Sequence, residues 1–214
     1  MAVTPSLESA ETPRFRAAWV LRPGVRTGFA AFVAILFAAS YTQPLWVTHL
    51  KAPQYPQGLR LYVYLDRTGG DVFEVNTLNH YVGMRPVEKM ATFERNIAYM
   101  ALMITCILAV VASTLRKTNW QMLLVLPLVL FPLGMILDLY AWLWYAGHSL
   151  QPDAPLSMTV KPFTPKIVGS QQIANFEVTS SLGLGTYMQL AASFLLAGAA
   201  VLGWRLSKRV ANVA

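Results

Sequence analysis

The chain has 214 residues, of which 55% are hydrophobic and 13% are charged. Soluble domains carry about a quarter charged residues, so this composition excludes an ordinary soluble protein and indicates a membrane protein. The net charge of +7 does not indicate nucleic-acid binding, because the basic residues are dispersed and flank apolar runs. The single cysteine, Cys106, lies in an apolar run, so we expect it to pack between helices and not to form a disulfide or a thiolate cluster.

Residues 1–26 are polar and contain three prolines and four arginines, which predicts a disordered cytoplasmic tail. Residues 27–47 are predicted to form the first membrane span, because an apolar run of about 20 residues crosses a bilayer core of about 30 Å. Trp46 would anchor its outer end at the interface. The alternative is a cleaved signal peptide, with Ala38 and Ser40 as the small residues before the cut. The long polar start of the chain and the apolar continuation to Trp46 favour an uncleaved span.

The next segment, 48–95, is polar and contains a predicted β-hairpin. Within 59–66, leucine and valine alternate with polar or aromatic residues, which is the period-two pattern of a half-buried strand. Residues 66–71 have turn chemistry, because their glycines allow positive φ, and 72–75 would return antiparallel. A lone hairpin is only marginally stable in water, so we expect it to pack on the second outer segment or on a partner.

Three further membrane spans are predicted, at 96–115, 120–146 and 186–204. The turn at 116–119 is so short that the second and third spans must form an antiparallel pair. Pro127 and Pro132 should kink the third span, with neighbouring helices satisfying the freed carbonyl groups. A second outer segment, 147–185, precedes the fourth span, and its stretch at 181–185 is expected to be a loop-to-helix joint. A short tail, 205–214, closes the chain.

The distribution of lysine and arginine predicts the orientation. The two tails and the short turn hold nine basic residues against two acids, whereas the two outer segments hold eight against seven. The positive-inside rule therefore places both termini in the cytoplasm and both outer segments in the periplasm of a bacterial inner membrane. The predicted fold is an all-α membrane protein with four transmembrane helices and a small β-hairpin in the first periplasmic segment.

Histidine and methionine in the outer segments are candidate metal ligands. His80 and Met84 are four residues apart, so in a helical turn they would share a face. Met90, His49 and His148 could complete a site. Thioether sulfur selects Cu(I) and imidazole also suits copper. Zinc and iron–sulfur clusters are poorly served, because these segments have no thiolate and only scattered carboxylates. The alternative is that the methionines pack in a core and the histidines occupy a turn or the membrane interface.

Asp138 is the only acid inside a predicted span. Ionisable groups in a membrane usually have a function or a partner. The structural alternative is a salt bridge to Arg95, or a hydrogen bond to Asn96 or to the segment around residues 160–169. No motif for haem attachment, no P-loop and no zinc-protease motif occurs in the chain.

Three stretches carry a resemblance to a known family: APQYPQGL at 52–59, LNHYVGM at 78–84 and KPFTPKIVGSQQIANF at 161–176. They resemble a bacterial family of small multi-span membrane proteins whose periplasmic loops carry APxYPxGL and LNHYxGM boxes. The resemblance covers the two outer segments, about 40% of the chain. It implies a context of respiratory copper enzymes of the nitrous oxide reductase type and their accessory proteins, and it implies no catalytic residue.

We therefore expect a non-enzymatic accessory protein that binds or delivers copper during maturation of a respiratory metalloenzyme. The alternative is a structural or docking subunit of a membrane respiratory complex, with tyrosines as the interface residues that such surfaces favour. These are Tyr55, Tyr62, Tyr64 and Tyr81. A transporter subunit with Asp138 on its path has less support, because four spans without repeats or broken helices do not match transporter folds.

Overall fold

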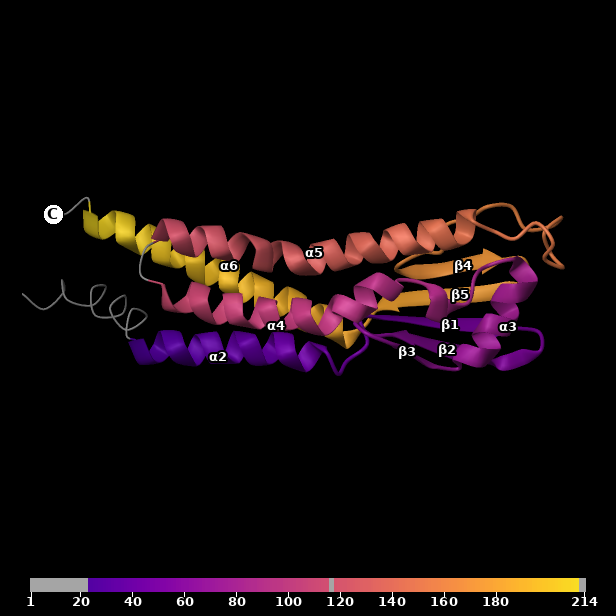
Figure 1. Ribbon diagram of the computed structural model, residues 1–214, viewed down its shortest axis with the longest axis horizontal. Helices are drawn as coiled ribbons and strands as arrows, with labels where there is room; N and C mark the ends of the chain where they lie inside the picture. Colours follow the sequence, from indigo (N-terminus) through magenta and orange to yellow (C-terminus); the bar gives the residue numbers. More distant parts are fainter. Residues whose placement is uncertain (1–22, 116–117, 212–214) are drawn as a thin grey trace, which may run out of the picture.

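The structure is a computed structural model that describes residues 23–115 and 118–211. A helical bundle forms one end of the elongated molecule and an antiparallel sheet forms the other (Figure 1). The bundle helices are α2 (Pro23–Ser40), α4 (Thr92–Thr114), α5 (Thr118–His148) and α6 (Leu184–Ala211). Parts of the predicted tails 1–26 and 205–214 and of the predicted turn 116–119 lie outside the described residues.

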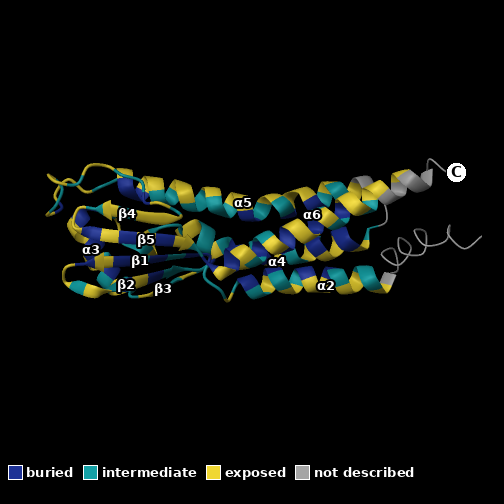
Figure 2. Ribbon diagram, turned by 180° about the vertical axis from the view of Figure 1, so that it is seen from behind, coloured by how far each residue is buried: buried dark blue, intermediate teal, exposed yellow. Residues whose placement is uncertain are grey.

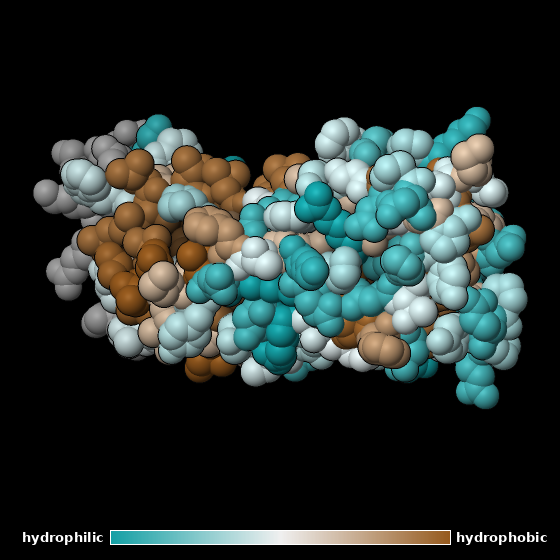
Figure 3. All heavy atoms as spheres, turned by 45° about the vertical axis from the view of Figure 1, so that its right-hand side comes forward, coloured by the Kyte–Doolittle hydropathy of each residue, from teal (hydrophilic) through white to brown (hydrophobic). Residues whose placement is uncertain are grey.

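Three of the described helices, α4, α5 and α6, are long and apolar enough to cross a membrane. The bundle interior is built from small and medium apolar side chains, such as Val33, Ala109 and Ala192, together with Phe37. Its outer surface also carries large apolar side chains, as the space-filling view shows (Figure 3). A bundle that is apolar on its outside requires an apolar solvent, so the chain is a membrane-embedded protein.

The predicted count of four transmembrane helices is wrong. The first predicted span, 27–47, corresponds to a shorter helix, α2, which ends at Ser40 and packs against α4 and α6. Pro44 lacks a backbone N–H and disfavours helical backbone at the residue before it, which accounts for the end of the helix in this region. Trp46 and Val47, the predicted outer end of the span, belong to a β-strand. The apolar run in the sequence is a helix followed by a buried strand.

The predicted all-α class is also wrong, because five strands form one antiparallel sheet. They are β1 (Trp46–Ala52), β2 (Tyr55–Val63), β3 (Thr68–Gly70), β4 (Gly169–Ile173) and β5 (Phe176–Leu182), in the order β3-β2-β1-β5-β4. The central strand β1 pairs with β2 on one side and with β5 on the other. The predicted hairpin does not pair with β5 directly, but Leu59 and Leu61 of β2 share one core with Phe176 and Val178 of β5. The expectation that the hairpin packs on the second outer segment is therefore confirmed through this common core.

The predicted hairpin is only partly correct. β2 and β3 pair as an antiparallel hairpin, but β3 is three residues long and ends at Gly70, whose φ is +87°. Residues 72–75, predicted as the returning strand, open helix α3 (Val72–Val82). Further along, apolar residues recur at the helical spacing of Val75, Leu78 and Val82, and this face of α3 is buried in the core of the sheet end.

One face of the sheet is covered and the other is open. Along β1, Trp46, Thr48 and Leu50 are buried, whereas the residues between them are not. Figure 2 shows buried stretches of β1 in dark blue. Apolar residues of α3 and of the outer end of α5, including Leu139 and Leu143, pack against the buried face. The open face carries polar side chains of β1, β2 and β5.

Helix α5 joins the two ends of the molecule. Its 31 residues extend about 46 Å at 1.5 Å per residue, which exceeds the bilayer core of about 30 Å. Pro132 removes the N–H that would bond the carbonyl of Leu128, and the Ser193 hydroxyl of α6 donates to that carbonyl at 2.9 Å. For Pro132, the prediction that a neighbouring helix satisfies the freed carbonyl is confirmed.

Candidate functional site

Helix α3 carries Phe73, the most exposed aromatic side chain among the described residues. Its buried face leaves Phe73, Thr77, His80 and Tyr81 on the outside, and the Phe73 and Tyr81 side chains are 79% and 45% exposed. The helix ends at Gly83 in the left-handed conformation, where Met84 N–H donates to the Asn79 carbonyl at 2.8 Å. The four outward-facing residues form what we call the α3 outer face.

A loop holds the end of α3 in place. The carbonyls of Tyr81 and Gly83 accept hydrogen bonds from the N–H groups of Leu156 and Gln151, at 3.0 and 2.8 Å. A Cβ atom at position 83 would lie 2.9 Å from the Gln151 carbonyl oxygen, so glycine is needed both for the positive φ and for this close approach. The α3 outer face therefore sits on a well-fixed backbone.

The predicted ligands Met84 and Met90 line the same cavity, but His80 does not. Both methionines line a cavity of about 90 Å³ between the buried face of the sheet, α3 and α5, which we call the sheet cavity. His80 is exposed on the α3 outer face, its ring 6.4 Å from the ring of Tyr81. His80 and Met84 do not share a helical face as predicted, because Gly83 ends the helix before Met84.

The two other predicted histidine ligands lie elsewhere. His49 is on the open face of the sheet, and its ring occupies the space where a Cβ at Gly58 would be, 2.3 Å from Nε2. His148 is the last residue of α5, where it stacks on Trp144 with ring centroids 4.7 Å apart. Among the described residues, no three side chains of the types His, Cys, Asp and Glu form a group that could hold a metal ion.

Asp138 lies where the bundle meets the sheet. It lines a second cavity of about 120 Å³, which we call the junction cavity, together with Arg95 of α4 and Trp46 of β1. The predicted salt bridge to Arg95 is not formed: the Arg95 guanidinium donates to the Val87 carbonyl at 2.9 Å, and the one ion pair in the described part of the chain joins Arg67 to Asp66.

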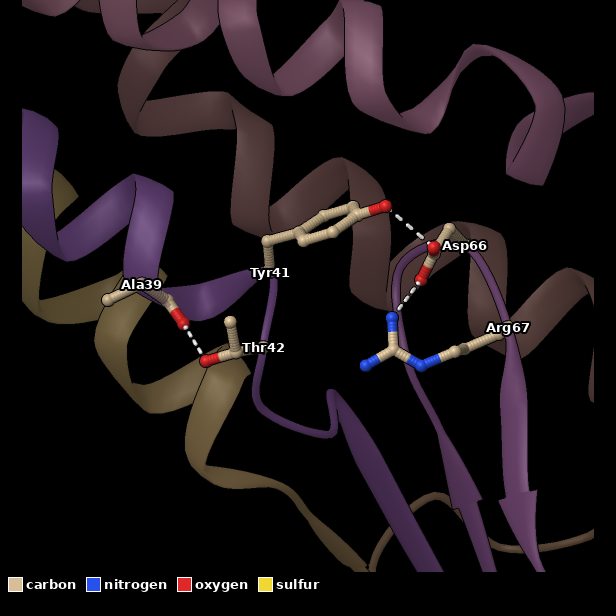
Figure 4. Close-up of polar contacts among 5 residues, drawn as sticks. All are labelled: Ala39, Tyr41, Thr42, Asp66 and Arg67. Atoms are coloured by element: carbon tan, nitrogen blue, oxygen red, sulfur yellow. Dashed lines mark hydrogen bonds and ion pairs between the residues drawn. The ribbon is translucent and has the colours of Figure 1, made fainter.

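A polar cluster fixes the bundle to the sheet (Figure 4). The Tyr41 hydroxyl, just after α2, donates to Asp66 Oδ2 at 2.6 Å, and Arg67 donates to Asp66 Oδ1 at 2.9 Å. The Arg67 guanidinium lies over the ring of Tyr64, 4.4 Å from its centroid. The hydrogen bond to Asp66, with a smaller contribution from burial, raises the pKa of Tyr41 above its usual value.

Two of the three motifs that carry the family resemblance line the sheet cavity. Met84 and Val82 come from the second motif, and Phe163 and Phe176 come from the third. The first motif contributes Leu59 to the surrounding core. Of the four tyrosines predicted as interface residues, only Tyr81 is exposed; the other three are partly buried. Neither the family models nor the curated proteins searched gave a match to this chain.

Sequence reasoning missed Phe73 and strand β5. A single exposed aromatic residue has no sequence signature, because only the fold decides which face of α3 is outside. For β5 a signal existed: residues 176–182 read FEVTSSL, and the burial alternates along most of that stretch. The alternation was hard to see because Ser180, a polar residue, occupies a buried position.

Proposed function

We propose that this chain is a non-catalytic membrane subunit that docks a partner protein through the α3 outer face. In a bacterium, the bundle would lie in the inner membrane and the sheet end in the periplasm. The observation that carries the proposal is the 79% exposure of the Phe73 side chain on a helix whose opposite face is fixed in the core. Exposed aromatic residues on a rigid surface are typical anchors of protein interfaces.

The residues of the α3 outer face support a protein as the docking partner. Phe73, His80 and Tyr81 provide three rings on one helix of 11 residues, so an apolar groove on another protein would fit them. The family resemblance favours a respiratory copper enzyme or one of its maturation proteins as that partner. The proposed orientation is supported by basic residues: Arg26 lies near the start of α2 and Lys208 near the end of α6, and both helix ends face away from the sheet (Figure 1).

In-cell photocrosslinking tests the docking proposal. A benzophenone amino acid at position 73 or 81 should give one discrete adduct with a partner protein. The same probe at Val168, which is 60% exposed at the sheet end but away from α3, is the matched control and should give no such adduct. Adducts of equal yield from all three positions, or none from 73 and 81, would contradict the proposal.

The substitution Phe73→Ala provides a second arm. Because the ring lies outside the core, we expect the stability of the isolated protein to change by about 0.5 kcal/mol or less, while co-purification of the crosslinked partner is lost. Loss of both stability and partner would indicate a structural effect instead.

A second candidate function, copper binding or delivery, is favoured by the shared cavity of Met84 and Met90. Two thioethers in an apolar space suit Cu(I). The other predicted ligands, His80, His49 and His148, would take no part in such a site. The test is copper stoichiometry by mass spectrometry after Cu(I) loading. We expect bound copper in the wild type and in His80→Ala, and its loss in the Met84→Leu/Met90→Leu double variant, which keeps the side-chain volume similar. A copper-free wild type would exclude this candidate.

A further inference from the structure

The junction cavity and the sheet cavity lie end to end between the sheet and α5. On α5, residues from Met135 to Leu143 line the junction cavity, and Leu143 and Ala146 line the sheet cavity. On β1, Trp46 lines both cavities, whereas Leu50 lines only the sheet cavity. Along the antiparallel strand β5, Phe176 and Val178 line the sheet cavity, and Leu182, near the end of the strand, lines the junction cavity. The two cavities share lining residues on α5 and on β1, so they adjoin, and we treat the row that they form as one elongated apolar space.

This space is long and narrow. From Met135 to Ala146 it follows α5 for about 16 Å at 1.5 Å per residue, and its two parts have volumes of about 120 and 90 Å³. For comparison, a compact apolar cavity of about 150 Å³ stays dry and binds benzene. By that comparison the two parts together hold roughly eight carbon atoms, and their elongated arrangement fits a segment of a linear hydrocarbon chain better than a compact ligand.

Polar side chains gather at one end of the space. The end nearer the bundle has five, whereas the sheet cavity has two, Thr48 and Asn79. The five are Tyr64, Thr68, Arg95, Asp138 and Thr186. One hydroxyl in each cavity is already hydrogen-bonded: Thr186 donates to the Leu45 carbonyl at 2.7 Å, and Thr48 pairs with Ser180 at 3.0 Å. Without these two, four polar side chains line the end nearer the bundle and one, Asn79, lines the far end. Such a gradient matches a molecule with a polar end near the membrane surface and an apolar chain that extends into the sheet end.

We propose that this space binds part of one acyl chain of a membrane phospholipid, and that this part leaves the bilayer at the junction and enters the sheet end. The bundle end is lined by Met135 and Ile136, which belong to a helix apolar enough to span the membrane. Trp46 and Trp142 also line it, and tryptophan is enriched at the level of lipid headgroups. The lipids of the bilayer are thus the nearest source of hydrocarbon. The site is independent of the α3 outer face.

Photolabelling of the full-length protein in vesicles tests the proposal. The probe is a phosphatidylethanolamine with a diazirine at the end of one acyl chain, in vesicles of phosphatidylethanolamine and phosphatidylglycerol without detergent. Mass spectrometry of the digested protein should find adducts on sheet-cavity residues such as Met84, Phe163 and Val178. Adducts confined to the outer surface of the bundle, at residues such as Leu137 and Phe194, would overturn the proposal.

A pair of variants on α5 tests whether the photolabelled acyl chain passes along this space. Leu143 lines both cavities, so Leu143→Trp should block the passage and lower the sheet-cavity adducts about tenfold, equivalent to about 1.4 kcal/mol of binding. Leu137→Trp, at a position 68% exposed on the same helix, should leave these adducts unchanged. Equal labelling in Leu143→Trp and Leu137→Trp would overturn the proposal. If Leu143→Trp does not fold, Ala146→Leu, which narrows only the sheet cavity, replaces it with the same expected loss.

A third experiment distinguishes a phospholipid from a free fatty acid as the source of the acyl chain. A free fatty acid with the same diazirine, added to unlabelled vesicles, should give weaker sheet-cavity labelling than the phospholipid probe. Labelling by the free fatty acid alone would overturn the assignment to a phospholipid.

Discussion

Ser193 compensates for a proline on another helix. Its side chain is 3% exposed, and its hydroxyl donates to the carbonyl that Pro132 leaves without a partner. We expect Ser193→Ala to destabilise the protein by about 1–2 kcal/mol, because a buried carbonyl then has no donor. The measurement is the unfolding free energy in mild detergent.

A double-mutant cycle with Pro132→Ala separates this cause from a general packing effect. The Pro132→Ala substitution restores the intrahelical N–H, so Ser193→Ala should then cost much less than in the wild-type background. The explanation fails if Ser193→Ala costs the same in the wild-type background and in the Pro132→Ala background.

Gly83 shows how one residue can redirect a candidate site. The spacing of His80 and Met84 predicted a shared helical face, and that prediction would hold if α3 continued. The left-handed conformation of Gly83, with φ of +90°, ends the helix and lets Met84 enter the cavity while His80 stays outside. The sequence contained the relevant signal, since glycine near the end of a helical pattern is a common C-terminal stop.

At the scale of elements, the contact between α2 and the β2–β3 turn depends on the neutral Tyr41 hydroxyl. Its hydrogen bond to Asp66 raises the pKa of Tyr41 in the folded state, so the folded protein keeps this proton at pH values where the unfolded chain has lost it. The stabilisation is therefore complete below about pH 10, the usual tyrosine pKa, and decreases as the pH rises through the folded-state value.

Unfolding temperatures between about pH 8 and pH 11 test this link around the usual tyrosine pKa. The wild type should lose more stability across that range than Tyr41→Phe, which has no proton to lose at this position. Tyr187→Phe, at a position 55% exposed on α6, is the control and should behave like the wild type. If Tyr41→Phe shows the same alkaline loss as the wild type, the hydrogen bond does not carry this contribution.

Elements were predictable where one pattern dominated the local sequence. The long apolar runs indicated α4, α5 and α6, and the alternation at 59–66 indicated β2, although the strand itself ends at Val63. β1 was not predicted, because its buried apolar residues continue the apolar run that begins in α2. The start of α3 was mistaken for a strand because four residues, VFEV, are too few to distinguish the two periods.

At the scale of the whole molecule, the sheet could not be predicted from local patterns, because its central pair joins distant parts of the chain. Trp46 pairs with Leu182, and two membrane-spanning helices lie between them in sequence. The cavities are a product of the same long-range arrangement, since their walls come from the sheet, α3 and α5 together. Composition and periodicity carry no information about such pairings, whereas they do indicate the membrane-embedded character.

The arrangement of the elements also predicts how the whole protein is placed across the membrane. α4 runs from the sheet end to the far end of the bundle, α5 returns, and α6 runs back again (Figure 1). Met158, which is 99% exposed in the loop after α5, and Lys208, near the end of α6, should therefore lie on opposite sides. In a Cys106→Ser background, Met158→Cys should react with a membrane-impermeant maleimide added to intact spheroplasts. Lys208→Cys should react only after the membrane is permeabilised, because the proposed orientation places the basic end of the bundle in the cytoplasm. Reaction of both positions from the same side would contradict the crossing of the bundle, and the opposite pattern would reverse the orientation.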